Sequence, residues 1–318
     1  MSLKNVKKLI TIINTPSTTS ELANILHLPF NEVKELINTL NKHNLLKSVC
    51  PNNPRYQVNH IPRFLDKKHI TTSITKFEKN CHIEIFDAID STNDYLLRTF
   101  SNKNNELSIC LAEMQNSGKG RADKNWISPA FQNIYMSLSF KTNTALTKLA
   151  KLSLVIGLSV VKTLEQFAHD FKVKWPNDIY YQEKKISGTL IETKDCSSGL
   201  KLVVIGVGVN VNMLANLESS WVSLRYITGK THDRNYIIPL LVENILNFTN
   251  LFLAEDFSAF EKMWTQYDLL YQKKITMNSF NDSVTGQYAG LNSNGEVILK
   301  VGKSLTAVPM HYNIESFD

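Results

Sequence analysis

Residues 172–178 read Lys-Val-Lys-Trp-Pro-Asn-Asp, and the rest of the chain can be interpreted outward from this run. Pro176 restricts the preceding Trp175 to an extended backbone, so a short lysine-flanked strand is expected to end there. Asn177 and Asp178 then favour a turn. An exposed aspartate at such a strand end is suited to helping hold a magnesium ion on ATP. A strand-ending turn beside a packed tryptophan explains the run equally well.

A second segment, residues 115–126, reads Gln-Asn-Ser-Gly-Lys-Gly-Arg-Ala-Asp-Lys-Asn-Trp. Its two glycines expose backbone N–H groups, and Lys119, Arg121 and Lys124 add positive charge. A loop of this composition suits a phosphate or an acyl-adenylate, although a solvated surface loop is the alternative. The spacing does not fit G-x-x-x-x-G-K-[ST], which excludes a P-loop.

Three further segments carry polar or glycine residues at strand ends. Residues 90–94, Asp-Ser-Thr-Asn-Asp, form either a helix N-cap or a set of small groups that hydrogen-bond a polar ligand. Residues 184–192 place a lysine pair before a strand in which Gly188 permits close ligand approach. Residues 204–212, Val-Ile-Gly-Val-Gly-Val-Asn-Val-Asn, indicate a buried strand. Their glycine spacing is not G-x-G-x-x-G, which excludes a dinucleotide fingerprint.

Between residue 83 and about residue 271, β-rich runs alternate with helical ones, which predicts one α/β or α+β domain holding most of the core. The predicted strands are 83–86, 108–113, 134–140, 172–174, 186–192 and 201–211. The predicted helices are 91–100, 146–168, 237–253 and 259–267.

The first sixty residues predict three short helices followed by two short strands around Pro51-Asn52-Asn53-Pro54. Three helices alone favour a bundle used for protein contact, whereas the added hairpin favours a winged helix-turn-helix. Basic residues outnumber acidic ones here, but Glu32 and Glu35 would lie close to phosphates if the third helix docks on DNA. The candidate DNA-binding residues are Thr18, Thr19, Asn31, Lys34 and Arg55.

The two remaining stretches complete the predicted domain organisation. Residues 62–79 are polar and are expected to serve as a connector. The last stretch has alternating short runs with Asn-Gly and Gly turns, which fits a small β-barrel or β-sandwich. The predicted units are the N-terminal unit at 1–61, the connector at 62–79, the central α/β or α+β domain at 80–271 and the C-terminal β unit at 272–318.

Composition narrows the class of protein. A chain of 318 residues with 43% hydrophobic and 20% charged residues is typical of two or three globular units. The formal net charge of +6 permits contact with phosphates without indicating a nucleic-acid protein. Four scattered cysteines argue against a disulfide framework or zinc site and favour free thiols in a reducing cytosol. No secretory signal or membrane span is evident, so a cytoplasmic protein is expected.

In this order and spacing, the segments resemble the biotin protein ligase family, in its bifunctional ligase and repressor class. The matching elements are Ser91-Thr92-Asn93, Gly118-x-Gly120-Arg121, Lys174-Trp175-Pro176-Asn177-Asp178, Lys185-x-x-Gly188 and Gly206-x-Gly208-x-Asn210. The resemblance implies an α+β architecture. It comprises an N-terminal winged helix-turn-helix, a central mixed α/β ligase domain like that of class II synthetases, and a C-terminal SH3-like β-barrel.

The resemblance also implies a two-step reaction. Biotin and MgATP give biotinyl-5′-adenylate and pyrophosphate, and a lysine of a biotin carboxyl carrier protein then takes the biotin, releasing AMP. It further implies a homodimer formed by the central sheets with biotinyl-AMP bound, and repression of biotin-biosynthesis genes through operator DNA.

Site residues carry over by position. The resemblance implies that biotin is bound by Ser91, Thr92, Asn93, Gln115, Lys119, Gly120, Arg121, Lys185 and Gly188. It implies that ATP and the adenylate are bound by Lys119, Arg121, Lys174, Asn177, Asp178, Asn210 and Trp221. The catalytic residues would be Arg121, which stabilises developing charge, and Lys185, which holds the biotin carboxylate or α-phosphate. Trp221 would stack on adenine, and Asp178 would help to hold Mg²⁺.

The glycine-rich loop departs from the family pattern Gly-Arg-Gly-Arg-x-Gly-Arg. Lys119 and Lys124 keep the charge but lose bidentate geometry, and Asp123 replaces a glycine. We expect activity to survive, with altered retention of the adenylate. Two other functions stay open: a lipoate ligase or octanoyltransferase, and a transcription regulator whose ligase-like domain only senses a ligand.

Overall fold

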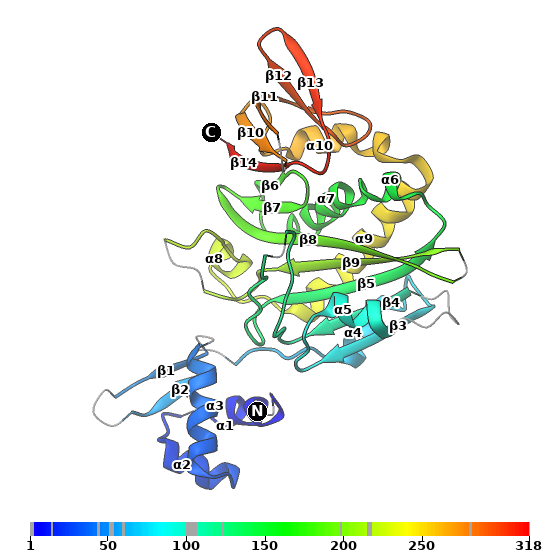
Figure 1. The fold of residues 1–318 in the computed structure, drawn as a ribbon. Helices are drawn as coiled ribbons and strands as arrows, with labels where there is room; N and C mark the ends of the chain where they lie inside the picture. Colours follow the sequence, from blue (N-terminus) through cyan, green and yellow to red (C-terminus); the bar gives the residue numbers. More distant parts are fainter. Residues whose placement is uncertain are drawn as a thin grey trace.

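The centre of the molecule is a seven-stranded mixed sheet in the order β3-β4-β5-β9-β8-β7-β6 (Figure 1). The structure is a computed structural model that describes residues 3–13, 15–42, 45–50, 54–58, 61–99, 107–122, 124–197, 199–214, 218–279 and 282–317. The strands of the central sheet are β3 (Cys81–Phe86), β4 (Leu107–Ala112), β5 (Ile134–Thr142), β6 (Phe171–Lys174), β7 (Asp178–Tyr181), β8 (Lys184–Asp195) and β9 (Lys201–Val209). β3 and β4 are parallel, and every other neighbouring pair is antiparallel.

Alternation along the strands gives the sheet two different faces. In β9, Val203, Ile205 and Val207 are buried in the main hydrophobic core. Leu202 and Val204 instead pack in a smaller cluster with α5 (Thr92–Thr99). Continuing that second register along β9 brings Gly206 and Gly208 to the α5 side of the sheet. At these two glycines β9 has no side chain of its own on this face, so other groups can approach the sheet closely there.

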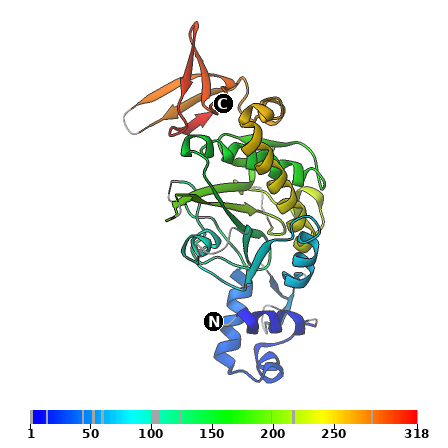
Figure 2. The ribbon, with the colours of Figure 1, turned by 90° about the vertical axis from the view of Figure 1, so that its right-hand side faces the viewer.

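Helices cover the apolar face. α7 (Leu152–Leu164) packs on β6, β7 and β8, and α9 (Arg234–Glu255) packs on α7, as Figure 2 shows from the side. By length and composition alone, α9 could cross a membrane. However, Ile237, Ile238 and Leu241 are buried in the main core, so one side of α9 packs against the rest of the protein.

Most of the predicted elements are present, with four differences. The predicted helix 146–168 is two helices, α6 (Leu146–Leu149) and α7. β9 ends at Val209 rather than 211. The strand β7 was not predicted. The stretch predicted as a polar connector contains α4 (Lys67–Ile74), whose Ile70 and Ile74 are fully buried in the main core.

The N-terminal unit consists of three helices and a hairpin. Its elements are α1 (Leu3–Ile12), α2 (Thr19–Leu26), α3 (Phe30–Lys42), β1 (Leu46–Ser48) and β2 (Tyr56–Val58). The unit has its own core, which extends into the central unit at Ala130 and Phe131. Phe64 meets Phe131 edge-on, with ring centroids 5.2 Å apart.

The C-terminal unit is a five-stranded antiparallel sheet in the order β13-β12-β11-β10-β14. Its strands are β10 (Lys274–Asn278), β11 (Ser283–Leu291), β12 (Val297–Val301), β13 (Ser304–Val308) and β14 (Asn313–Phe317). It is joined to the centre through η1 (Phe257–Phe260) and α10 (Glu261–Tyr267). Trp175 Nε1 donates to the Gly295 carbonyl at 3.1 Å, so the tryptophan of the 172–178 run anchors this unit.

Candidate active site

A cavity of about 800 Å³ opens on the α5 side of the central sheet. It is lined by every residue predicted to bind biotin or the adenylate: Ser91, Thr92, Asn93, Gln115, Lys119, Gly120, Arg121, Lys174, Asn177, Asp178, Lys185, Gly188, Asn210 and Trp221. These residues come from the start of α5, from the loop after β4, from β6 to β8, and from the segment between β9 and α8. The structure thus brings together side chains that are far apart in the sequence, while their individual roles stay predictions.

One end of the cavity is a network of neutral polar groups. Thr92 donates to Gln115 Oε1 through its backbone N–H at 2.9 Å and through its hydroxyl at 3.2 Å. Gln115 Nε2 in turn donates to Ser128 Oγ at 3.1 Å. These bonds define which end of the Gln115 amide faces each neighbour, so this wall is held in place before any ligand arrives.

Asn93 hydrogen-bonds to other residues of the protein, whereas the resemblance implies only that it binds biotin. The Ser137 hydroxyl donates to Asn93 Oδ1 at 2.6 Å, and Asn93 Nδ2 donates to Glu192 Oε2 at 2.7 Å. The residue is only 4% exposed. A Cβ at residue 206 would overlap the Asn93 amide, so Gly206 is the residue that lets the amide lie on the sheet. Asn93 therefore supports the cavity floor, and its predicted contact with the biotin ring stays a prediction.

Trp126 covers the middle of the floor. A Cβ at residue 208 would lie 2.5 Å from the Trp126 ring, so Gly208 allows the indole to rest on β9. Trp126 Nε1 is buried and has no hydrogen-bond partner among the residues that the structure describes. A buried unpaired donor lining a cavity points to a ligand acceptor. Trp126 was not among the predicted site residues, although it ends the glycine-rich segment.

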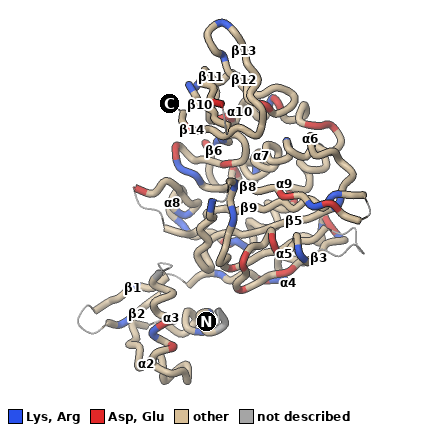
Figure 3. The backbone as a smooth tube through the Cα atoms, in the orientation of Figure 1, with Lys and Arg blue, Asp and Glu red and all other residues tan. Residues whose placement is uncertain are grey.

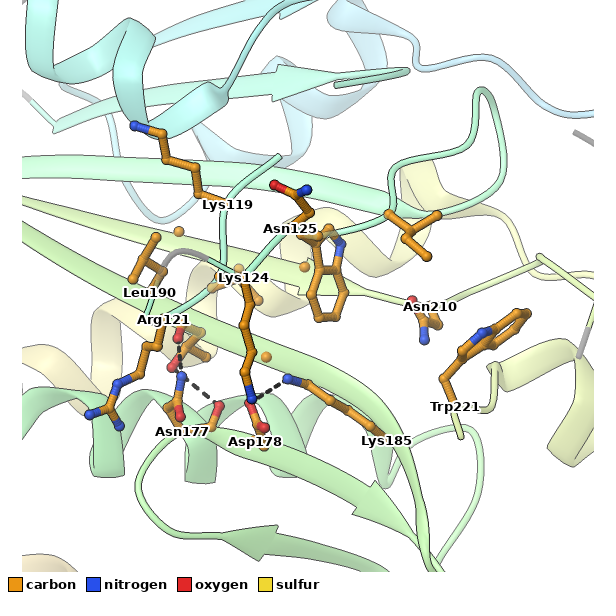
Figure 4. Close-up of a pocket in the computed structure, with 18 of the residues that line it drawn as sticks. Lys119, Arg121, Lys124, Asn125, Asn177, Asp178, Lys185, Leu190, Asn210 and Trp221 are labelled. Carbon is orange, nitrogen blue, oxygen red and sulfur yellow. Dashed lines mark hydrogen bonds and ion pairs between the residues drawn. The ribbon is translucent and has the colours of Figure 1, made fainter. Parts of the chain in front are cut away.

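The other end of the cavity is cationic (Figure 4). Lys185 Nζ forms an ion pair with Asp178 Oδ1 at 2.7 Å, and Figure 4 shows Lys124 directed toward this pair. Gly188 passes beneath it, since a Cβ there would lie 3.1 Å from Lys185 Nζ. Asp178 is the one carboxylate among the described residues that line the cavity. Figure 3 shows other Lys and Arg positions beside β6 and β8.

Burial makes this end unfavourable for uncompensated positive charge. It lowers the pKa of the Arg121 guanidinium and of the Lys174 ammonium, although Asp178 opposes both shifts. Lys185 and Lys124 lower the pKa of Lys174 further by repulsion. Burial, with Asp178 nearby, raises the pKa of Tyr180 to about 12, so its phenol is neutral near pH 7. A phosphate placed here would neutralise the clustered cations.

Asn210 and Trp221 lie on the side of the cavity beyond Lys185. Asn210 Nδ2 donates to the Val222 carbonyl at 3.1 Å and so fixes the segment that carries Trp221. The same segment pairs with Lys185, because the Val222 N–H donates to the Lys185 carbonyl at 2.9 Å. Trp221 is half-buried at the cavity border. Its position allows stacking on a flat ring, which stays a prediction.

Lys119, for which the resemblance implies contacts with biotin and the adenylate, has a partner within the protein. Its ammonium pairs with Asp94 Oδ1 at 2.7 Å, and that hydrogen bond raises its pKa. Figure 4 shows it pointing away from Asp178 and Lys185. In this structure Lys119 therefore ties the loop to α5 rather than joining the cationic end. The prediction for Asp123 falls on a residue outside the described ones.

The candidate DNA-binding residues divide into two groups. Thr18 caps α2 by accepting from the Glu21 N–H at 3.2 Å, and Arg55 pairs with Glu21 at 3.2 Å. These two side chains therefore stabilise the start of α2, while Thr19 is half-buried in its first turn. Asn31 and Lys34 are exposed on α3, where a partner can reach them.

Three cavity residues have no signal in the local sequence. Tyr180 lies on β7, and Asn313 and Ile314 lie on β14 of the C-terminal unit. Whether these residues reach the cavity depends on how distant segments pack together, including the C-terminal sheet against β6. A short sequence motif does not predict such packing.

Comparison with known proteins identifies the family. Residues 85–210 match the Biotin/lipoate A/B protein ligase family. The bifunctional ligase/repressor BirA of Escherichia coli is 30% identical over 223 residues, which is 69% of each chain. The chain belongs to the biotin protein ligase family.

Other family members agree with this assignment. BirA of Bacillus subtilis is 25% identical over 233 residues, covering 71% of this chain and 72% of that protein. Among solved structures, the biotin protein ligase of Aquifex aeolicus in complex with biotin and ATP superposes with a TM-score of 0.63 at 27% identity. That superposition covers 74% of this chain and 98% of the Aquifex chain. The mixed α/β fold is therefore that of a biotin protein ligase.

Proposed function

We propose that this chain activates biotin with ATP and transfers it to a lysine of a biotin carboxyl carrier protein. The observation that carries the proposal is the division of the cavity into a neutral polar end and a cationic end. The fused rings of biotin suit the first end, and the triphosphate suits the second. The carboxylate of biotin then faces the α-phosphorus near Lys185.

In the first step, a biotin carboxylate oxygen attacks the α-phosphorus of ATP, and pyrophosphate leaves. Lys185 and Arg121 supply positive charge for the phosphate oxygens, which gain charge as the bond forms. The chain needs no covalent nucleophile. Its contribution is alignment of two bound reactants and stabilisation of charge, with water kept from the mixed anhydride.

Magnesium fits the cationic end through Asp178. Mg²⁺ commonly binds through one or two carboxylates together with substrate phosphates, so a single lining carboxylate is sufficient. Asp178 would hold the ion, which would supply neutralisation of phosphate charge. Lys185 pairs with the same carboxylate at 2.7 Å, so nucleotide binding rearranges this pair.

In the second step, the acceptor lysine amine attacks the acyl carbon of biotinyl-AMP, and AMP leaves. The test of the first step is to mix the protein with biotin and MgATP, then to measure pyrophosphate and biotinyl-AMP. We expect about one equivalent of each per active site before acceptor is added, and none without biotin. Absence of both products, with biotin still bound, would instead favour a ligand-sensing regulator.

Biotin is preferred to lipoate as the substrate because the neutral end presents several fixed hydrogen-bonding groups to a polar ring system. Lipoate offers a dithiolane ring without hydrogen-bonding groups. Calorimetric titration should therefore detect biotin and not lipoate. Binding of lipoate with no response to biotin would reassign the chain to lipoate or octanoate transfer.

A repressor role is a second candidate, supported by the arrangement of the N-terminal unit. Its three helices and β1–β2 hairpin suit a winged helix-turn-helix, and α3 exposes Asn31 and Lys34. The C-terminal sheet suits an SH3-like barrel. The proposal includes a cytoplasmic homodimer that binds operator DNA when biotinyl-AMP is present.

Fluorescence anisotropy with DNA from upstream of biotin-biosynthesis genes tests the repressor role. The variant Lys34→Ala should weaken binding and reduce its salt dependence. The control Lys76→Ala changes an exposed lysine outside the N-terminal unit. Equal DNA affinity of the wild type, Lys34→Ala and Lys76→Ala would show that Lys34 of α3 does not contribute to DNA binding.

A further inference from the structure

The C-terminal sheet reaches the cationic end of the cavity through its last strand. Figures 1 and 2 both place β14 against the region of β6, which ends at Lys174. Asn313 and Ile314 of β14 line the cavity itself. A C-terminal side chain can therefore act on the groups that would meet the nucleotide.

Lys174 lies between two aromatic rings. Its ammonium nitrogen is 4.3 Å from the centroid of Phe317, on β14, and 5.7 Å from the centroid of Tyr180, on β7. Both distances are within the ~6 Å range of a cation–π interaction. Among the residues that the structure describes, Lys174 forms no ion pair. The two aromatic rings therefore orient the Lys174 ammonium, a role that a carboxylate plays for a lysine in an ion pair.

Lys185 differs from Lys174 because its ammonium, which lies 5.3 Å from the centroid of the Trp126 ring, also pairs with a carboxylate. Asp178 holds its ammonium at 2.7 Å and cancels much of its charge. A ring face attracts a cation through its quadrupole and carries no net charge, so it orients Lys174 without neutralising it. Lys273 also approaches Phe317, at 5.0 Å from the centroid, so one ring gathers two ammonium groups at this end.

We propose that Phe317 is a positioning residue that holds the Lys174 ammonium toward the terminal phosphates of the bound nucleotide. The use of ATP then depends on how the C-terminal sheet is seated. The identity of the nucleotide rests on the proposed function, whereas the placement of Lys174 for a polyphosphate does not.

Phe317 can be changed without detaching the C-terminal unit, because other contacts hold it. Trp175 Nε1 donates to the Gly295 carbonyl at 3.1 Å, and Lys151 Nζ donates to the Ser293 carbonyl at 3.3 Å. Tyr288, Val297 and Leu299 are fully buried in the main core. Phe317 itself is half-buried.

The experiment measures calorimetric binding of inorganic tripolyphosphate and, separately, of biotin to the full chain. The variants are Phe317→Leu, which keeps apolar volume and removes the ring, and Phe317→Trp, which restores a ring. We expect Phe317→Leu to weaken tripolyphosphate binding about 3- to 10-fold. Phe317→Trp should return it to about the wild-type value, and biotin binding should not change. The control Leu305→Ala, at a side chain 69% exposed in the same sheet, should alter neither ligand.

A kinetic split gives the second readout. Phe317→Leu should raise KM for ATP by about the factor by which it weakens tripolyphosphate binding, and it should leave KM for biotin unchanged. Wild-type tripolyphosphate affinity in Phe317→Leu, failure of Phe317→Trp to restore a lost affinity, or parallel loss of both ligands would each overturn the proposal. If the wild type forms no biotinyl-AMP but the tripolyphosphate pattern is as expected, the role of Phe317 stands and the proposed function falls.

Discussion

The two ends of the cavity are built on different principles. At the neutral end, Gln115 and Asn93 are already bonded to their neighbours, and Gly206 leaves room for the Asn93 amide on β9. At the cationic end, several basic side chains lie near Asp178, which pairs with Lys185, and burial lowers the pKa of Arg121 and Lys174. The first end is complete without ligand, whereas the second acquires its missing negative charge from one. Changes at the two ends should therefore affect biotin and phosphate separately.

The largest expected effect comes from Lys185→Ala. Removing this ammonium takes away charge stabilisation at the reacting phosphate, and we expect the single-turnover rate of adenylate formation to fall about 100- to 1,000-fold. The matched control is Lys184→Ala, one residue earlier on β8, where strand alternation directs the side chain to the other face. If both variants react at the wild-type rate with unchanged melting temperatures, Lys185 is not in the active site.

Gly206→Ala should disturb the neutral end. Its Cβ would overlap the Asn93 amide, and overpacking of this kind costs about 1–3 kcal/mol. Biotin affinity should fall about 5- to 100-fold, while tripolyphosphate affinity holds. The control Gly157→Ala adds the same methyl group in α7, where its Cβ would lie 3.3 Å from Val173 and where Gly157 is not among the described residues that line the cavity. Equal loss of both ligands in Gly206→Ala would show that the two ends are not independent.

Arg121→Ala should act on the cationic end more mildly than Lys185→Ala. The guanidinium is one of several cations there, so we expect adenylate formation or retention to fall about 10-fold, measured by single-turnover kinetics and by release of labelled biotinyl-AMP. Arg121→Lys should recover part of the loss. Unchanged formation and retention in Arg121→Ala would count against its assigned role.

The smallest expected effect is that of salt, which should weaken tripolyphosphate binding more than biotin binding. Raising ionic strength from about 0.05 M to about 0.5 M shortens the screening length severalfold, so tripolyphosphate binding should weaken clearly. Biotin binding should change much less, because its ring contacts are neutral. Parallel salt dependence for both ligands, measured by titration, would contradict the division of the cavity.

Much of this site could be predicted from local sequence because its motifs lie at strand ends. The run at 172–178, the loop at 115–126 and the glycines of β9 each carry turn or glycine chemistry that a short segment reveals. Strand β7 was missed because Asp178 was predicted to lie in a turn with Asn177, whereas the turn covers residues 175–177 and Asp178 begins a strand of only four residues. Helix α4 was missed because its polar residues conceal the burial of Ile70 and Ile74.

Other features depend on contacts between distant segments. The internal bonds of Asn93, the pairing of Lys119 with Asp94 and the approach of Phe317 to Lys174 join residues from different elements. Asn93 and Lys119 were predicted as ligand contacts from the family resemblance, and a match of motifs does not reveal the partners that the fold supplies within the protein. The same limit applies to Arg55, which pairs with Glu21.

The most direct test of the central claim is transfer of labelled biotin to a purified biotin carboxyl carrier domain, with and without ATP. We predict ATP-dependent labelling of the acceptor lysine, and loss of that labelling in the Lys185→Ala variant. An acceptor that stays unlabelled in the presence of ATP, while the protein still binds biotin tightly, would contradict the account and identify a sensor instead of a ligase.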